Sequence, residues 1–173
     1  AITNCRSDVT INAQREAGGI VGTLANGGVI SLCENTGNIK ISNKETYAGG
    51  IAGHNIEGII KDCSNSGKIE NGTDGFRNRL GGIAGFLDNG TIESSTNTGE
   101  VISNSTDASY TGDTTQNYVG GIVGYNSYGT VTSCTNNGRV YNAVPYAGGV
   151  AGYLMRGSLL DCSYDETLNS GLE

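Results

Sequence analysis

The side chains best able to do chemistry in this chain are five cysteines, which recur at one position of a repeated block. They are Cys5, Cys33, Cys63, Cys134 and Cys162, and Ser95 stands at the sixth equivalent position. Thiolates can bind zinc or form disulfides, but a zinc site needs converging ligands such as Cys-x-x-Cys, which the chain lacks. An odd number of cysteines at equivalent positions also does not suit a disulfide framework. We therefore predict a stack of small buried side chains, with disulfides or a metal site as the alternatives.

The sequence contains few candidates for a catalytic site or a cofactor-binding loop. His54 is the one histidine, so a Ser-His-Asp or Cys-His device would have to use it, yet the equivalent positions hold Thr23, Phe86 and Tyr125. The glycine-rich blocks lack the Gly-x-Gly-x-x-Gly pattern and the lysine of nucleotide-binding loops, and they lack the aspartate of calcium-binding β-rolls. We predict no catalytic residue, no metal ligand and no cofactor, so the chain is not expected to be an enzyme.

Paired carboxylates would indicate a polysaccharide-cleaving β-helix, because such enzymes place them on neighbouring coils of one outer face. We call residues at the same position of successive repeats a column. The column before the cysteines holds Asp62 and Asp161, which lie three repeats apart, and the column before that holds Glu93 as its one carboxylate. A polysaccharide lyase is therefore only a distant alternative.

These residues are positioned by a five-fold repeat with the signature Gly-Gly-Ile-x-Gly. Its copies are Ala17–Gly22, Ala48–Gly53, Leu80–Gly85, Val119–Gly124 and Ala147–Gly152. A second block, Gly-x-Ile-x-x-Cys-x-Asn-x-Gly-x-Ile, follows them at Gly28–Ile39, Gly58–Ile69, Gly90–Val101 and Gly129–Val140. A partial copy opens the chain and a degraded one closes it. A period of about 30 residues is typical of solenoids.

The spacing within the repeat predicts the fold. Each repeat holds three short apolar segments bounded by Gly or Asn turns, which leaves no room for a helix. The first glycine of each pair precedes the cysteine position by 14 or 15 residues, as from Gly18 to Cys33, so the segments should stack in register. We predict an all-β fold: a single-stranded parallel β-helix of about five coils, each a triangle of three short strands. Residues 1–173 should form one such domain, a fragment of a larger protein.

Two kinds of column support this register. Lys40 and Glu70, and likewise Lys61 and Glu93, should lie on neighbouring coils with opposite charges in contact. Four asparagines also share a column: Asn35, Asn65, Asn97 and Asn136. Since an amide both donates and accepts, these side chains favour an internal ladder that links adjacent coils. The alternative is a solvent-facing Asx turn.

Composition excludes some classes of partner. The chain has 173 residues and a net charge of −7, which argues against nucleic acid as a partner, since nucleic-acid binding requires basic patches. No apolar run approaches the roughly 20 residues that span a membrane, so membrane insertion is not expected. The 29 glycines and single proline are typical of many short strands joined by tight turns. We expect a monomer.

The three blocks Gly-Gly-Ile-x-Gly, Gly-x-Ile and Cys-x-Asn-x-Gly resemble the GLUG repeat of bacterial surface proteins. This resemblance implies a non-catalytic repeat region of a large extracellular bacterial protein, such as the part outside the catalytic region of some immunoglobulin A peptidases. The chain departs from the pattern at three places: Ser95 replaces cysteine, a long insert follows Val101, and the Asn and Gly after Cys162 are lost.

All variation in repeat length falls at one corner, after the last aliphatic of each second block. The longest insert lies between Val101 and Gly120, and the next longest, Glu70 to Leu80, belongs to the preceding repeat. We predict that the two inserts form one protruding ligand-binding lobe. Its candidate residues are Asp74, Phe76, Arg77, Asp107, Tyr110, Asp113 and Tyr118. The alternative is a drifted insertion that binds nothing, which the sequence alone slightly favours.

The function that this pattern favours is a non-catalytic stalk or adhesive segment at the bacterial surface, with a host protein or a glycan as the possible partner. The alternative is a carbohydrate-binding module of a secreted enzyme. Such a module would bind glycans through exposed aromatic side chains. The candidates are Tyr110, Tyr118, Tyr125, Tyr128, Tyr141, Tyr146 and Tyr153.

Overall fold

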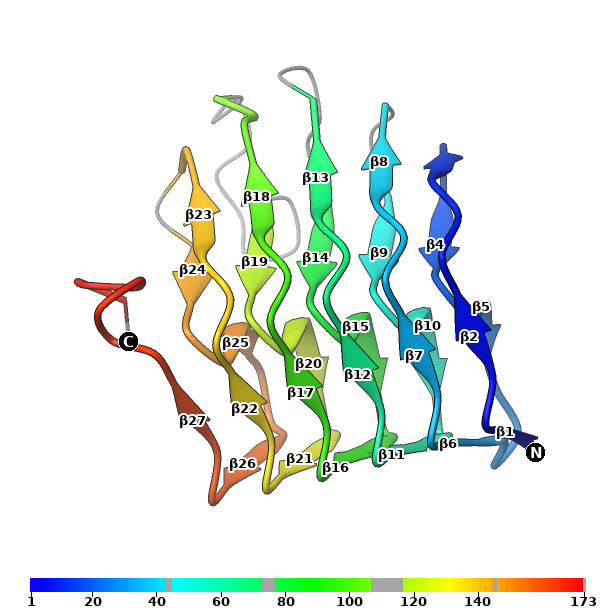
Figure 1. Ribbon diagram of the computed structural model, residues 1–173. Helices are drawn as coiled ribbons and strands as arrows, with labels where there is room; N and C mark the ends of the chain where they lie inside the picture. Colours follow the sequence, from blue (N-terminus) through cyan, green and yellow to red (C-terminus); the bar gives the residue numbers. More distant parts are fainter. Residues whose placement is uncertain (43–44, 73–76, 107–116, 145, 173) are drawn as a thin grey trace.

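The computed structural model describes residues 1–42, 45–72, 77–106, 117–144 and 146–172. These residues form short strands and no helix, and every strand pairs with its neighbours in parallel. Figure 1 shows the coils stacked side by side along one axis, with the two termini at opposite ends of the stack. The predicted all-β parallel solenoid of about five coils is confirmed.

Five parallel sheets, which we call A to E in the order in which the chain visits them, run along the axis. Sheet A contains β1 (Ile2–Thr3), β6 (Val29–Ser31), β11 (Ile59–Lys61), β16 (Thr91–Glu93), β21 (Thr130–Thr132) and β26 (Ser158–Leu160). Sheet B contains β2 (Arg6–Ser7), β7 (Glu34–Asn35), β12 (Ser64–Asn65), β17 (Thr96–Asn97), β22 (Thr135–Asn136) and β27 (Ser163–Tyr164).

The other three sheets have five strands each. Sheet C contains β3 (Ile11–Ala13), β8 (Ile39–Ile41), β13 (Ile69–Asn71), β18 (Val101–Ser103) and β23 (Val140–Asn142). Sheet D contains β4 (Glu16–Gly18), β9 (Tyr47–Gly49), β14 (Arg79–Gly81), β19 (Tyr118–Gly120) and β24 (Ala147–Gly148). Sheet E contains β5 (Val21–Leu24), β10 (Ala52–Ile56), β15 (Ala84–Asp88), β20 (Val123–Ser127) and β25 (Ala151–Leu154).

The two coils that contain β7 and β12 turn at three sharp corners, at each of which one residue adopts the left-handed backbone conformation. In the coil that contains β7 these are Leu32 between sheets A and B, Glu45 between C and D, and Glu57 between E and A, with φ of 54°, 59° and 57°. The next coil uses Asp62, Arg77 and Asn89 in the same places. The corners divide the coil into three faces, formed by sheet A, by sheets B and C, and by sheets D and E.

The prediction of three strands per coil is wrong, because each complete coil contains five. Two of the three faces bend in the middle. The Gly-Gly-Ile-x-Gly segment is divided at its glycine pair, so that β9 ends at Gly49 and β10 begins at Ala52. The Cys-x-Asn-x-Gly segment forms a strand of its own, such as β12, before the aliphatic residue starts the next strand.

The interior holds two apolar clusters. The first is enclosed by sheets A and E and contains Ile30, Ile60 and Leu87, together with the isoleucine of the signature, such as Ile51. The second lies between sheets C and D and contains residues such as Ile39 and Leu80. These isoleucines and leucines are fully buried, and burial of each such side chain stabilises the fold by about 1.5–3 kcal/mol.

The four asparagines of sheet B form a buried ladder along the axis. Asn35 Nδ2 donates to Asn65 Oδ1, Asn65 Nδ2 to Asn97 Oδ1, and Asn97 Nδ2 to Asn136 Oδ1, each over 2.8 Å. Each Nδ2 also donates to the carbonyl of the glycine two residues later, as Asn65 does to Gly67 over 2.9 Å. The side chains are buried, so a solvent-facing turn does not describe them.

The cysteine column follows the corner between sheets A and B. All five cysteines are free thiols: Cys33, Cys63 and Cys134 are buried in the first apolar cluster, Cys162 is partly buried and Cys5 is exposed at the end of the stack. Cys63 Sγ donates to the Lys61 carbonyl over 3.1 Å, and Ser95 Oγ accepts from the Cys63 amide over 3.2 Å. Burial raises the pKa of the Cys63 and Cys134 thiols to about 11.

Among the described residues, no helix is long and apolar enough to cross a membrane. The predicted charge columns are present: Lys40 pairs with Glu70 in sheet C, with 3.3 Å between Nζ and Oε1, and Lys61 lies opposite Glu93 in sheet A.

Candidate functional site

Two of the seven residues of the predicted lobe lie in the described part of the chain. Arg77 stands at the corner before β14, and its Nη1 lies 2.7 Å from Oε1 of Glu45 on the neighbouring coil. Tyr118 begins β19 and is fully buried. The other five candidates lie outside the described residues, so the lobe stays a prediction. They are Asp74, Phe76, Asp107, Tyr110 and Asp113.

The described surface instead gathers aromatic side chains where sheets D and E meet. One column on the outer side of sheet D contains Glu16, Tyr47, Arg79 and Tyr118. A column of sheet E contains Thr23, His54, Phe86, Tyr125 and Tyr153. Because the chain bends sharply at the glycine pair between the two strands, the two columns face one another. We call this surface the aromatic groove.

The rings of the aromatic groove contact one another from coil to coil. His54 stacks on Phe86 with 4.6 Å between centroids and 9° between planes, and Tyr47 meets both rings edge-on at 5.3 Å. Phe86 in turn meets Tyr125 edge-on at 5.2 Å, and Tyr118 lies 5.3 Å from Tyr125. Edge-to-face and offset contacts of this kind stabilise by about 0.5–1.5 kcal/mol each beyond area burial.

Arg79 lies at the centre of these rings. Its Cζ is 4.7 Å from the ring centroids of Tyr47, Phe86 and Tyr125. A guanidinium at this distance is attracted by the negative faces of the rings. The Arg79 side chain also lines a pocket of about 220 Å³ with Glu45, Tyr47 and Arg77. The groove therefore combines a fixed cation with aromatic walls.

His54 ends the row of rings on the N-terminal side. Its Nδ1 lies 3.6 Å from Glu16 Oε1, and the Thr23 hydroxyl donates to the other oxygen of Glu16. Burial lowers the pKa of His54 below its usual value, although the Glu16 carboxylate acts in the opposite direction. The imidazole is therefore neutral at pH 7 and packs as one more ring, not as a charged group.

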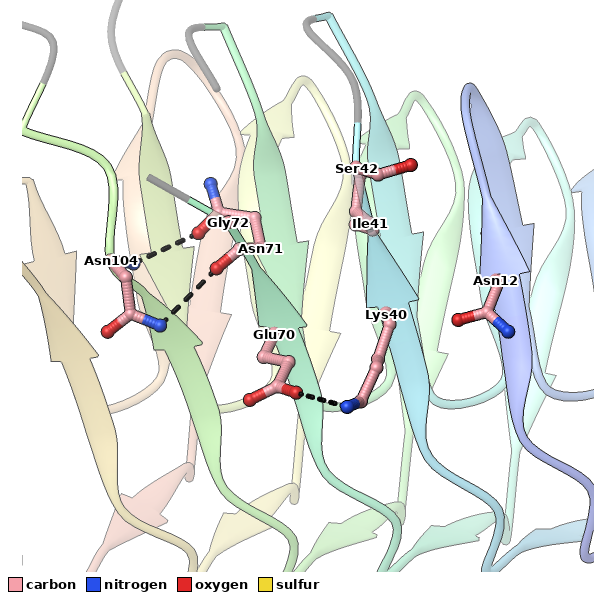
Figure 2. A pocket seen from close by; sticks show the side chains of 8 residues that line it. All are labelled: Asn12, Lys40, Ile41, Ser42, Glu70, Asn71, Gly72 and Asn104. Atoms are coloured by element: carbon pink, nitrogen blue, oxygen red, sulfur yellow. Dashed lines mark hydrogen bonds and ion pairs between the residues drawn. The ribbon is translucent and has the colours of Figure 1, made fainter. Parts of the chain in front are cut away.

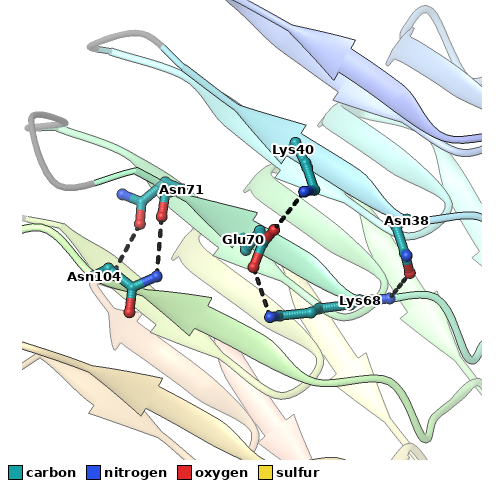
Figure 3. A network of polar contacts seen from close by, with 6 residues as sticks. All are labelled: Asn38, Lys40, Lys68, Glu70, Asn71 and Asn104. Atoms are coloured by element: carbon teal, nitrogen blue, oxygen red, sulfur yellow. Dashed lines mark hydrogen bonds and ion pairs between the residues drawn. The ribbon is translucent and has the colours of Figure 1, made fainter.

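A second hollow, of about 350 Å³, lies on the outer face of sheet C (Figure 2). It is lined by Asn12, Lys40, Ile41, Ser42, Glu70, Asn71, Gly72 and Asn104. Figure 3 shows its polar contacts: Glu70 accepts from Lys40 over 3.3 Å and from Lys68 over 2.6 Å, and Asn104 Nδ2 donates to the Asn71 carbonyl over 3.3 Å. The hydrogen bond from Lys68 is the main cause that lowers the pKa of Glu70. Glu70 is thus paired with two lysines and has no free charge to offer a ligand in this pocket.

The exposed aromatics proposed for glycan binding are corrected in part. Tyr118 and Tyr125 are buried against other rings, so they do not offer open faces. Tyr128 and Tyr141 are exposed, while Tyr146 and Tyr153 are partly buried and Tyr110 lies outside the described residues. Tyr47, Arg79 and Phe86 are not among the candidate binding residues that we predicted from the sequence. A signal was present, since two residues before each glycine pair the chain has Glu16, Tyr47, Arg79, Tyr118 and Tyr146.

Comparison with known families identifies a sequence motif in the central coils. Residues 45–70, 77–102 and 115–141 match the model of the GLUG motif. The chain carries three GLUG motifs. Each matched stretch runs from just before a strand of sheet D to a strand of sheet C, so one GLUG motif corresponds to one coil. No curated protein and no solved structure matches the chain.

Proposed function

We propose that this chain is a non-catalytic segment of an extracellular bacterial surface protein, in which it serves as a stalk that holds an adhesive surface away from the cell. The observation that carries this proposal is the direction of the hydrogen bonds. Both the backbone ladders between coils and the asparagine ladder run along the axis that joins the two ends of the stack (Figure 1). Tension between the ends is therefore directed along these bonds between coils.

The GLUG motifs support the same role, since each motif builds one coil and adds one rung to the stack. Adjacent coils are separated by the strand spacing of a sheet, about 4.8 Å, so length grows in proportion to the number of motifs. A repeat with this geometry suits a spacer whose reach is set by copy number.

A second candidate, a carbohydrate-binding module, is favoured by the aromatic groove. Partly exposed Tyr47 and Phe86 lie beside a fixed guanidinium, and rings of this kind pack against the apolar faces of sugars while polar groups bind the hydroxyls. The two candidates are compatible, because an adhesive stalk can carry a glycan site on one of its faces.

The proposal places the chain outside the cell, so it is tested by locating the chain in its source organism. Antibodies raised against this chain are applied to intact cells and to permeabilised cells. We expect equal staining of both, and removal of the epitope when intact cells are treated with protease. Staining that requires permeabilisation would overturn the proposal. An antibody against a cytoplasmic protein serves as the control for cell integrity.

A further inference from the structure

Arg79 is a cation whose hydrogen-bonding capacity is not used within the described residues. Its Nε is buried and has no hydrogen-bond partner, and no carboxylate of the described chain lies within ion-pair distance of it. A buried N–H without a hydrogen-bond partner is unfavourable. Arg79 also lines an open pocket, so its guanidinium can donate to an acceptor that enters this pocket from outside.

The neighbouring cation differs in this respect. Arg77 lines the same pocket, but its Nη1 is already bound to Glu45 over 2.7 Å. Arg79 is held instead by the rings of Tyr47, Phe86 and Tyr125, which fix its position without neutralising its charge. The pocket therefore contains one paired and one unpaired guanidinium, and the unpaired one is preorganised.

The chemistry of the pocket points to a carboxylate. A guanidinium has a planar fork of donors that matches the two oxygens of a carboxylate. At about 220 Å³ the pocket is below the range of about 300–1,000 Å³ that holds drug-sized ligands, so it accommodates one charged unit of a longer molecule. Partly exposed rings lie together beside Arg79 and present apolar contacts to the neighbouring units of such a molecule; they are Tyr47, His54 and Phe86.

We propose that Arg79 and Tyr47 bind the carboxylate-bearing unit of an acidic saccharide, of the uronic-acid class, laid along the aromatic groove. This inference rests on the second candidate function above and adds the chemical class of ligand and the residue that selects it. Arg79 contributes the ion pair and Tyr47 the apolar wall of the pocket.

The experiment is isothermal titration of the whole chain with the trimer of galacturonic acid and with its methyl ester, which has the same shape without the charge. We expect the acid to bind at least about tenfold more tightly than the ester, equivalent to about 1.4 kcal/mol. Arg79→Gln should abolish this preference, while Arg79→Lys, which keeps the charge and most of the stem, should retain part of it. The preference should shrink as salt is raised.

Arg139→Gln is the matched control, because its guanidinium also lies over a ring, that of Tyr141 at 5.5 Å, but outside the aromatic groove. It should bind both trimers as the unchanged chain does. Thermal melts identify any variant that fails to fold; in that case the comparison of acid with ester on the unchanged chain decides the question.

Each contrary outcome overturns a different part of the proposal. Equal binding of acid and ester overturns the carboxylate inference and leaves the carbohydrate-binding candidate. Absence of binding of both trimers up to about 10 mM overturns both of these and leaves the stalk. Binding of tri-glutamate as tight as that of the acid trimer overturns the assignment to a saccharide, and a preference that survives in Arg79→Gln overturns the role of this residue.

Discussion

Gly50 lies directly against the side chain of Asn65, which stands 15 residues later on the opposite wall of the stack. A Cβ added to Gly50 would be 2.3 Å from Asn65 Cγ, and the same relationship joins Gly82 to Asn97 at 2.3 Å and Gly121 to Asn136 at 2.2 Å. In these three pairs the second glycine is therefore required because the asparagine ladder fills the space opposite. The Gly-Gly-Ile-x-Gly block and the Cys-x-Asn-x-Gly block of the repeat therefore contact one another through this glycine and this asparagine.

This contact predicts the effect of adding one methyl group. Gly82→Ala would place its Cβ 2.1 Å from the Gly121 carbonyl oxygen as well as against Asn97, and both neighbours are fixed in the stack. We expect a loss of about 3 kcal/mol in the free energy of unfolding, measured by denaturant titration. Gly72→Ala is the control, since its added Cβ has no heavy atom within 4 Å, and it should leave stability unchanged or slightly raised. Equal effects of the two changes would contradict the packing argument.

The asparagine ladder predicts a second stability effect. Asn97→Ala removes the acceptor of Asn65 and the donor to Asn136 in a buried site, so a side chain on each neighbouring coil loses one of its hydrogen bonds. It also removes both hydrogen bonds between Asn97 and the backbone of Gly99. We expect a loss of about 2–4 kcal/mol. Asn137→Ala, at the exposed residue next to the ladder, should cost less than about 0.5 kcal/mol. If the melting temperatures of the two variants agree, the ladder does not contribute as described.

The cysteine column predicts a graded reactivity of its thiols. With a pKa of about 11, Cys63 and Cys134 are ionised to only about one part in a thousand at pH 8, and burial also shields them from reagents. Exposed Cys5 and partly exposed Cys162 should therefore be labelled first by iodoacetamide, and all five thiols should react after denaturation. Mass spectrometry of the labelled peptides gives the order. Early labelling of Cys63 would show that the column is accessible.

His54 predicts a dependence of stability on pH. Because its pKa is lower in the folded chain than the ordinary 6.5, the unfolded chain binds more protons as the pH falls below about 6.5, and stability decreases. Protonation would also place a second N–H at the buried Nε2, which has no hydrogen-bond partner. Unfolding measured between pH 7 and 5 should show a steeper fall for the unchanged chain than for His54→Gln. Parallel curves would exclude a role for this imidazole.

Glu70 affects the stability of the fold at a lower pH than His54 does. Its pKa is lowered, chiefly by Lys68, so its contribution is complete above the ordinary 4.5 and is lost as the pH falls through the folded value. Glu70→Gln should therefore flatten the stability curve below about pH 4.5, and leave the decline between pH 7 and 5 unchanged. A change in that upper range would mean that the two groups are coupled.

Much of the architecture could be predicted because the repeat is regular. The constant offset from each cysteine to the next aliphatic residue, as from Cys33 to Ile39, places equivalent residues in one column. The pairing of Lys40 with Glu70 follows from that alone. The strand count could not be read in the same way. Whether Gly49 and Ala52 belong to one strand or two depends on how sharply the chain bends at the glycine pair, which apolar spacing does not encode.

The aromatic groove could not be predicted from the sequence for a related reason. Tyr47 and His54 are seven positions apart in the sequence and belong to different strands, so no column contains both. Their rings come within 5.3 Å only because β9 and β10 fold toward one another on the outer side. Contacts within a column follow from the repeat, whereas contacts between columns require the angles between strands.

The central claim, that the stack is a stalk that resists tension, is tested most directly by pulling on its two ends in a single-molecule force experiment. Since the asparagine ladder lies along the direction of pull, Asn97→Ala should lower the unfolding force of the chain, and Asn137→Ala should not. We expect the unchanged chain and Asn137→Ala to share one force distribution, with Asn97→Ala shifted to lower force. Identical distributions for all three chains would contradict the claim that the ladder carries tension.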